Sequence, residues 1–204
     1  MVPVLLVGVA GVVSAVGLGT NRGQTVVVAG DSLTAQAQAK ITLVLAADGW
    51  IPIVEGHSGS SATNRNAVFD WPPRMTQLAA THPGVVVIEL GTNDCGNCGN
   101  DLDAAIDRLL APLSHVGRVV WLTAQTDVEV TTDPCRVNDA VRKATVRWPN
   151  LEVLDMGDHF GGHPEWHTGD GVHFNDVGSK ELATLIQDAV DAPPSRVGAL
   201  SAVV

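Results

Sequence analysis

The sequence predicts an α/β protein of the three-layer α/β/α sandwich class, built on a five-stranded parallel sheet. Short apolar runs without polar alternation, such as residues 26–29 and 85–88, are typical of strands that are buried on both faces. Segments with apolar residues at steps of three and four follow these runs, as in helices that pack on a sheet. Strands and helices that alternate at this spacing form βαβ units with right-handed crossovers.

The elements follow one another in a regular order. The first strand, 25–30, breaks at Gly30, and a helix over about 33–47 ends at Asp48-Gly49. Pro52 at the start of the second strand indicates an edge position, because proline cannot donate to a sheet ladder. The other predicted strands are 51–55, 85–90, 119–123 and 151–155, and the other helices are about 71–80, 101–113, 133–148 and 176–190. A long loop, 156–174, precedes the last helix.

Length and composition indicate one globular domain. The chain has 204 residues, 45% of them hydrophobic and 17% charged, which is enough for a single sizeable core. A net charge of −10 argues against a nucleic-acid partner, because no basic patch is available to neutralise phosphates. We expect the domain to span 23–192 and to be monomeric, with a flexible tail at 193–204.

The first 22 residues form a segment of their own. Residues 2–19 carry no charge, and their length falls between a signal-peptide core and a membrane-spanning helix. No basic residue precedes the run, but Val13-Ser14-Ala15 would serve as a small-residue cleavage site. The alternative is a buried first element of the domain. We expect a signal peptide or a membrane anchor, and therefore a secreted or envelope-anchored protein with possible membrane association.

The three cysteines fit an exported protein. Cys95 and Cys98 are close together in a Gly/Asn loop, and Cys135 lies at the start of a later helix. A lone CxxC also occurs in redox sites and zinc half-sites, but no second CxxC is present. We expect one disulfide, either between this loop and Cys135 or between Cys95 and Cys98.

Residues that can take part in catalysis or ligand binding follow the strands of the predicted sheet. They are Gly30-Asp31-Ser32, His57-Ser58-Gly59-Ser60, Gly91-Thr92-Asn93-Asp94 and, in the last loop, Asp170-Gly171-Val172-His173. Ligands of open α/β sheets bind at the carboxyl ends of the strands, so these groups can converge. Ser32 also fits a helix N-cap, since Ser and Asp are both preferred there.

These residue types together make an acyl-transfer set. A serine hydroxyl needs a base to take its proton, and His173 is the candidate base for Ser32. Asp170 can accept from His173 Nδ1–H and so leave Nε2 facing the serine. The Ser32 N–H, the Gly59 N–H and the Asn93 amide can donate to an oxyanion.

GDSL at 30–33, the glycine at 59, GTND at 91–94 and DGVH at 170–173 resemble the four sequence blocks of the SGNH/GDSL hydrolase family. Their order and spacing match over residues 25–190. The resemblance implies a flavodoxin-like sheet of order 2-1-3-4-5 and hydrolysis of an ester or thioester without a cofactor. It also implies that Ser32, Gly59, Asn93 and His173 are the four family residues and that Asp170 completes the triad.

The stretch WLTAQ…VNDAVRK…WPNLEVLDM is similar to SGNH domains linked to acetyl transfer or deacetylation of bacterial envelope glycans. We therefore expect a serine esterase that acts on a small-molecule, glycan or lipid ester, such as a short-chain or acetyl ester. The alternatives are an O-acetyltransferase for an envelope glycan, which shares the acyl-enzyme, and a non-catalytic glycan-binding module.

Other readings of the sequence are weaker. Gly56-His-Ser-Gly-Ser60 nearly matches the G-x-S-x-G elbow, but its fifth residue is Ser60 and little of the domain precedes it. A phosphate-binding flavodoxin-like module is disfavoured because Asp31 would repel a phosphate. We expect no metal site from His159, His163 and His167, since Gly161, Gly162 and Pro164 preclude a regular helix there.

For some residues the sequence leaves the role in the protein open. Trp166 and Trp71, in apparent loops, can stack on a sugar or hold an acyl chain, or they can fill gaps in the packing. Asp94 is expected to order its own turn. Asn138 and Asp139, on a predicted helix, can be plain surface residues.

Overall fold

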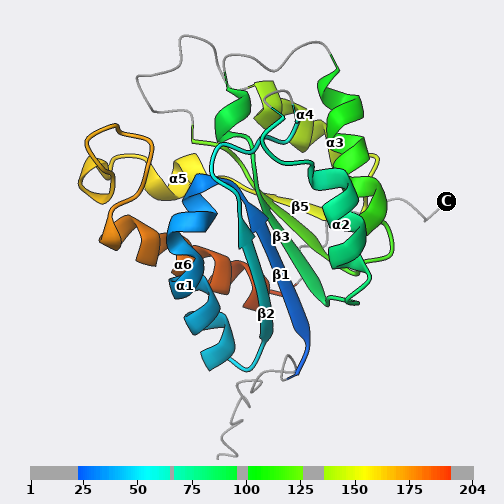
Figure 1. Cartoon of the computed structure of the whole chain (residues 1–204), viewed down its shortest axis with the longest axis horizontal. Helices are drawn as coiled ribbons and strands as arrows, with labels where there is room; N and C mark the ends of the chain where they lie inside the picture. Colours follow the sequence, from blue (N-terminus) through cyan, green and yellow to red (C-terminus); the bar gives the residue numbers. More distant parts are fainter. Residues whose placement is uncertain (1–22, 65–66, 96–100, 126–135, 194–204) are drawn as a thin grey trace, which may run out of the picture.

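The computed structural model describes residues 23–64, 67–95, 101–125 and 136–193 of the chain. Within these residues, parallel strands form one five-stranded sheet with the order β2-β1-β3-β4-β5 (Figure 1). The strands are β1 (Thr25–Gly30), β2 (Ile51–Gly56), β3 (Val85–Glu89), β4 (Val119–Leu122) and β5 (Leu151–Leu154). The predicted fold class and strand order are confirmed, and Pro52 lies in an edge strand as expected.

Helices cover both faces of the sheet. They are α1 (Ser32–Ala47), α2 (Trp71–Ala79), α3 (Leu102–Leu110), α4 (Arg136–Ala144), α5 (Met156–Phe160) and α6 (Asp176–Asp191), with 3₁₀ turns η1 (Thr92–Asp94), η2 (Ala111–Leu113) and η3 (Pro164–Trp166). The loop predicted at 156–174 therefore contains α5 and η3. A five-residue helix is too short to show a helical period, so the sequence pattern did not reveal α5.

The side chains of each strand point alternately into two apolar cores, one on each face of the sheet. On β1, Val26 and Val28 pack with α1 and α6, whereas Val27 and Ala29 pack with α2, α3 and α4 on the other face. Because successive side chains of a strand point to opposite faces, a run of apolar residues serves both cores at once. The sheet is thus the middle layer of the three-layer sandwich (Figure 1).

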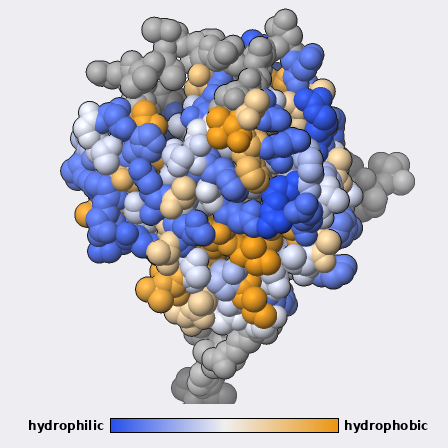
Figure 2. Space-filling model, in the orientation of Figure 1, coloured by the Kyte–Doolittle hydropathy of each residue, from blue (hydrophilic) through white to orange (hydrophobic). Residues whose placement is uncertain are grey.

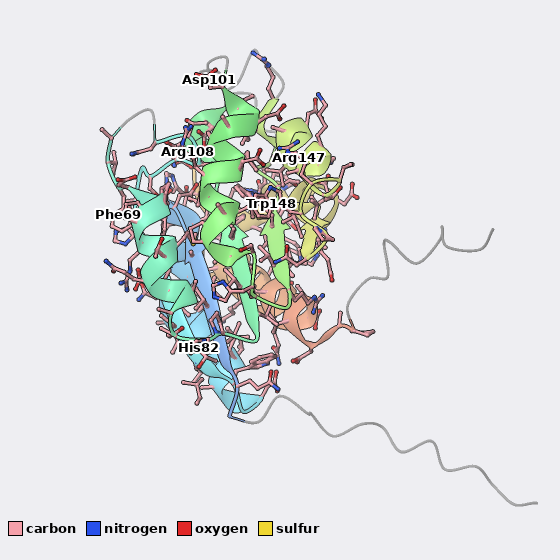
Figure 3. All side chains as sticks on the ribbon, turned by 90° about the vertical axis from the view of Figure 1, so that its right-hand side faces the viewer. Phe69, His82, Asp101, Arg108, Arg147 and Trp148 are labelled. Carbon is pink, nitrogen blue, oxygen red and sulfur yellow. The ribbon has the colours of Figure 1, made fainter. Side chains whose placement is uncertain are left out.

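Polar side chains join neighbouring helices at the surface. Asp107 of α3 accepts hydrogen bonds from Arg147 and from the indole Nε1 of Trp148, the latter at 2.7 Å. Figure 3 shows Arg147 and Trp148 beside α3, just beyond the end of α4. The face seen in Figure 2 is mostly hydrophilic, with small separate hydrophobic patches. None of the helices in the described ranges combines the length and apolarity needed to cross a bilayer.

The carboxyl ends of the central strands lie at one level. Gly30 is the register partner of both Gly56 and Glu89, so β1, β2 and β3 end side by side. Asp31 N–H donates to the Glu89 carbonyl at 3.1 Å, and His57 N–H donates to the Gly30 carbonyl at 2.9 Å. The turns that carry the GDSL, Gly59 and GTND residues therefore start from adjacent points.

Some sequence-based expectations fall outside the described residues. These include the N-terminal apolar segment, residues 194–204 of the expected tail, the first residues of the helix expected over 133–148 and two of the cysteines, Cys98 and Cys135. The expected export or anchoring remains a prediction.

Candidate active site

Ser32 is the first residue of α1, directly after β1. Asp31 is the N-cap, and its carboxylate accepts from Leu33 N–H at 3.0 Å. The capping role that also fitted Ser32 therefore belongs to Asp31, and the Ser32 hydroxyl is available for other contacts. Gly30 allows this arrangement, because a Cβ there would lie 2.0 Å from Thr34 Oγ1 and 2.8 Å from the Glu89 carbonyl oxygen.

His173 lies between Ser32 and Asp170. Its Nε2 is 3.0 Å from Ser32 Oγ, and its Nδ1 is 2.7 Å from Asp170 Oδ2. An ionised carboxylate can only accept, so the Asp170 contact assigns the proton to Nδ1. The neutral ring then offers Nε2 as an acceptor for the Ser32 hydroxyl. The structure brings together the three residues that the sequence proposed as a triad.

The chain around Asp170 forms a tight turn that holds its carboxylate. Oδ1 accepts from His173 N–H at 2.9 Å, from Val172 N–H at 3.0 Å and from Thr168 Oγ1 at 2.8 Å. The hydrogen bond from the His173 side chain, followed by the backbone N–H groups, lowers the pKa of Asp170. The carboxylate therefore stays ionised, and its half-exposed position in water favours the same form.

The residues after His173 anchor it to the domain. Phe174 is buried and stacks on Phe160 of α5 with ring centroids 4.4 Å apart. Asn175 caps α6 by accepting from Val177 N–H and Gly178 N–H. A buried ring and a helix cap directly after the histidine fix the direction in which its side chain leaves the backbone.

Asn93 and Gly59 lie on two loops beside Ser32. The Asn93 amide Nδ2 donates to the Ser60 carbonyl at 2.8 Å and to Asp31 Oδ2 at 3.3 Å. Gly59 has φ +79°, a backbone conformation that favours glycine, and among the described residues a Cβ there would meet Val68 alone, at 3.8 Å. The requirement for glycine at 59 is thus conformational.

A model of the GDSL-like lipase/acylhydrolase family matches residues 28–180, which include every site residue described above. The chain belongs to this family. It is accordingly a hydrolase that acts on ester bonds. No curated protein sequence matches it.

Solved structures with this fold include an O-acetyltransferase domain and esterases that act on carbohydrates. The C-terminal catalytic domain of peptidoglycan O-acetyltransferase A from Streptococcus pneumoniae is 20% identical, with a TM-score of 0.63 over 82% of this chain and 92% of that one. An acetyl xylan esterase variant from Geobacillus stearothermophilus is 16% identical, with a TM-score of 0.62 over 84% and 96%. A family 3 carbohydrate esterase from Clostridium thermocellum is 17% identical, with a TM-score of 0.61 over 81% and 94%. At such identities these structures show the GDSL-like fold alone.

Asp94 joins two loops of this GDSL-like site, a role beyond the expected ordering of its own turn. Its buried carboxylate accepts from Ala62 N–H at 2.7 Å and from Thr63 N–H at 3.0 Å. The Thr63 hydroxyl donates to the same carboxylate. Asp94 thus fastens the Gly59-bearing loop to the turn that carries Asn93. A sequence cannot show which backbone groups a turn carboxylate will reach, so this role was missed.

Glu89 is a second residue that the sequence analysis did not single out. It is 1% exposed, and its Oε2 accepts from Thr34 N–H at 3.2 Å and from Thr34 Oγ1 at 2.9 Å. Burial and the nearby charge of Asp31 raise the pKa of its carboxyl group. The available signal was one acidic residue at the end of an otherwise apolar strand, two residues before the GTND motif of the family.

Trp71 is not a substrate-binding surface, and that expectation is wrong. It is the first residue of α2, fully buried in the core, and its indole Nε1 donates to Ser60 Oγ at 3.0 Å. The rings of His57 and Phe69, from the loop between β2 and α2, pack edge-on against it. Trp166 is half-buried in η3 and stacks on His163 with centroids 3.7 Å apart, so its substrate-binding role stays a prediction.

The loop histidines have separate partners. His163 Nδ1 contacts Glu165 at 2.9 Å, and His167 Nε2 contacts Gln125 Oε1 at 2.9 Å. His159 Nε2 is 4.0 Å from Glu181. Within the described ranges, no three His, Cys, Asp or Glu side chains gather closely enough to hold a metal ion.

Two further polar residues of the GDSL-like domain can now be placed. Asn138 is buried, and its side-chain amide makes a pair of 2.8 Å hydrogen bonds with the backbone of Ala124, so the surface reading of Asn138 is wrong. Asp139 is exposed as expected and pairs with Arg142. Cys95 is disulfide-bonded, and both candidate partners lie outside the described residues.

Proposed function

We propose that the protein is a serine esterase that works through an acyl-enzyme on Ser32. The observation that carries the proposal is the position of His173, with one ring nitrogen on Ser32 Oγ and the other on Asp170. This is the geometry in which an imidazole takes a proton from a hydroxyl nucleophile and a carboxylate orients the ring.

Each step follows from these contacts. Ser32 Oγ attacks the ester carbonyl carbon while His173 Nε2 takes the hydroxyl proton. Collapse of the tetrahedral intermediate breaks the bond to the alcohol oxygen, and His173 returns its proton to that oxygen. A water molecule then attacks the acyl-Ser32 ester with the same base, which releases the carboxylic acid and restores the serine.

Three donors would stabilise the intermediate. We assign the oxyanion to the Ser32 N–H, the Gly59 N–H and the Asn93 amide. Ser32 starts α1, so the positive end of the helix dipole lies where negative charge develops. The Asn93 contact with Asp31 is 3.3 Å long, which makes it the weaker of the two hydrogen bonds that this amide donates and the one that an oxyanion would replace.

The proposed substrate is a short-chain or acetyl ester carried by a glycan or lipid. Similarity to an acetyl xylan esterase and a peptidoglycan O-acetyltransferase supports an acetyl group on a carbohydrate. The uncharged run at residues 2–19 supports a secreted or envelope-anchored enzyme, where such glycans are found.

The test is turnover of p-nitrophenyl esters from acetate to octanoate by folded protein. We expect the highest kcat/KM at the short end, and Ser32→Ala should remove turnover. Ser58→Ala is the matched control, because Ser58 is an exposed serine near the site and should tolerate the change. Absence of turnover at every chain length, or loss with Ser58→Ala only, would reject the proposal.

Transfer of an acetyl group to a glycan hydroxyl is the second candidate. It is favoured by the similarity to the Streptococcus pneumoniae O-acetyltransferase domain and needs the same acyl-Ser32. Adding soluble glycan oligosaccharides to a reaction with an acetyl donor distinguishes the two. Hydrolysis releases acetate regardless of the glycan, whereas a transferase moves the acetyl group onto the oligosaccharide, which mass spectrometry detects.

A further inference from the structure

Two carboxyl groups are enclosed directly behind Ser32. Asp31 is 0% exposed and Glu89 is 1% exposed, and they come from adjacent strands whose ends are in register. Asp31 N–H donates to the Glu89 carbonyl, and the charge of Asp31 raises the pKa of Glu89. Two enclosed carboxyl groups this close cannot both be ionised near neutral pH, because their negative charges repel, so we infer that the pair holds one proton.

The surroundings decide which residue keeps the proton. Asp31 accepts from Leu33 N–H and from the Asn93 amide, and both contacts favour its ionised form. The polar partner that Glu89 has besides Asp31 is Thr34. Burial, followed by the charge of Asp31, raises the pKa of Glu89 well above its usual value, whereas burial raises that of Asp31 to about 6. Glu89 is therefore the protonated member at neutral pH.

The Asn93 side chain connects this carboxyl pair to the proposed oxyanion site. Asp31 Oδ2 accepts from the same Asn93 amide that would donate to the oxyanion. The charge on the pair therefore acts directly on an oxyanion donor. With one proton present, a single negative charge lies behind Asn93. Loss of the proton would place a second negative charge there and would oppose the oxyanion.

We propose that Glu89 is a positioning residue for ester cleavage: as a carboxylic acid it donates to Asp31, and so keeps the group that holds the Asn93 amide at a single negative charge. This inference rests on the proposed serine-esterase function. It assigns Glu89 no contact with the substrate.

Four side chains from other elements face the pair and bear on its pH dependence. They are Thr34 of α1, Thr92 and Asn93 of η1 and His173 of the loop before α6. Of these four, His173 is the ionisable one, and a positive charge on it lowers the pKa of Asp31. Loss of the proton from Glu89 at high pH would add a negative charge behind Asn93, so we assign the alkaline limb of the pH profile to this residue.

The experiment compares Glu89→Gln with Glu89→Leu. Glutamine still donates to Asp31 and accepts from Thr34 but does not titrate, so kcat at neutral pH should stay within about threefold of wild type. Its alkaline limb should move upward by about one pH unit or more, or vanish. Leucine cannot donate, and we expect it to lower kcat about tenfold or more while KM changes less than about twofold.

Glu152→Gln is the matched control. Glu152 is another carboxylate of the same sheet. It lies on β5, pairs with Arg118 and is away from the site, so the pH profile of the Glu152→Gln enzyme should equal that of wild type. Equal alkaline limbs for wild type and Glu89→Gln would overturn the proposal. So would a loss of kcat with glutamine as large as that with leucine. Circular dichroism confirms folding, and the glutamine variant carries the test if the leucine variant does not fold.

An infrared measurement separates this inference from the proposed function. At neutral pH the wild-type spectrum should contain the carbonyl band of a protonated carboxylic acid, and Glu89→Gln should lack it. This readout needs no substrate, so it stands even if no ester is turned over. Absence of the band in wild type would overturn the proton on Glu89, whatever the activity.

Discussion

At the scale of single residues, the carboxylate of the proposed triad is half exposed. The Asp170 side chain is 51% exposed and that of His173 is 35% exposed. Water can therefore replace part of what Asp170 gives the imidazole, in contrast to a triad whose acid is buried. What water cannot replace is orientation, because Asp170 also accepts from the backbone N–H of His173 and so ties the ring to its own turn.

Asp170→Asn tests how much of the rate depends on that orientation. An asparagine keeps the turn but offers Nδ1 a weaker or wrongly directed partner, so we expect kcat to fall roughly 10²-fold, toward the lower end of what removal of a triad acid costs. The measurement is kcat and KM on p-nitrophenyl acetate.

Asp158→Asn is the control for this change, since Asp158 is an exposed carboxylate on α5. Its kinetics should match wild type. A loss of less than about threefold with Asp170→Asn would contradict a catalytic role for this carboxylate.

At the scale of elements, the site depends on loops that leave neighbouring strands. β2 leads into the loop that carries Gly59, β3 leads into η1 with Asn93, and β1 leads into α1 with Ser32. In-register strand ends place the starts of these loops, but Asp94 fixes their far ends to each other. Loops of this kind hold their shape through such tertiary hydrogen bonds.

Asp94→Ala should therefore damage the site without touching the triad. The change leaves the buried N–H group of Ala62 without its acceptor, and we expect a loss of unfolding free energy of about 2–3 kcal/mol. Displacement of Gly59 and Asn93 should lower kcat roughly 10–10²-fold. Urea denaturation and steady-state kinetics measure the two effects.

Thr63→Val is the milder companion, because it removes the hydroxyl donor and keeps the backbone one. We expect it to fall between wild type and Asp94→Ala in both measurements. An Asp94→Ala protein with wild-type kcat would show that the contacts of Asp94 with residues 62–63 serve stability alone.

At the scale of the whole molecule, the buried carboxyl pair influences how stability depends on pH. A carboxyl whose pKa is raised by folding binds its proton more tightly in the folded state. Its contribution therefore favours folding at low pH and is lost as the pH rises from its ordinary value toward its folded one. For Asp31 that range is 3.8 to about 6, and Glu89 extends it upward. Glu55 and Asp170 act in the opposite sense below this range, because hydrogen bonds from Arg74 and His173 lower their pKa values.

We therefore expect maximum stability in mildly acidic solution, near pH 4–5, and a decrease toward neutrality. Asp31 alone should account for about 1–3 kcal/mol of that decrease. Urea denaturation from about pH 4 to pH 8 measures it.

Comparison with Glu89→Gln isolates the pair from the general repulsion of a chain with net charge −10. The glutamine variant should have a flatter curve and be the more stable protein at neutral pH, whereas Glu152→Gln should follow wild type. Parallel curves for wild type and Glu89→Gln would exclude the pair as the cause.

The sequence by itself determined the order of strands and helices and named the triad. Apolar runs predict strands buried on two faces, and Ser32, Asn93, Asp170 and His173 follow the ends of strands or precede a helix, where parallel sheets gather ligand-binding groups. These are local patterns, so a linear reading finds them. The same reading misjudged short or isolated features, such as α5, and it left Ser32 with two roles.

Only the tertiary structure decided what each polar or aromatic side chain contacts. Trp71 is core packing because it belongs to the apolar cluster on one face of the sheet and the loop after β2 folds over it, and Asp94 joins two loops because residues 62–63 lie beside it. Asp31 took the cap and left the Ser32 hydroxyl to His173. Glu89 shares a proton with Asp31 because β1 and β3 end at one level. Contacts between residues far apart in sequence depend on strand register and packing, which residue types at fixed spacings do not encode.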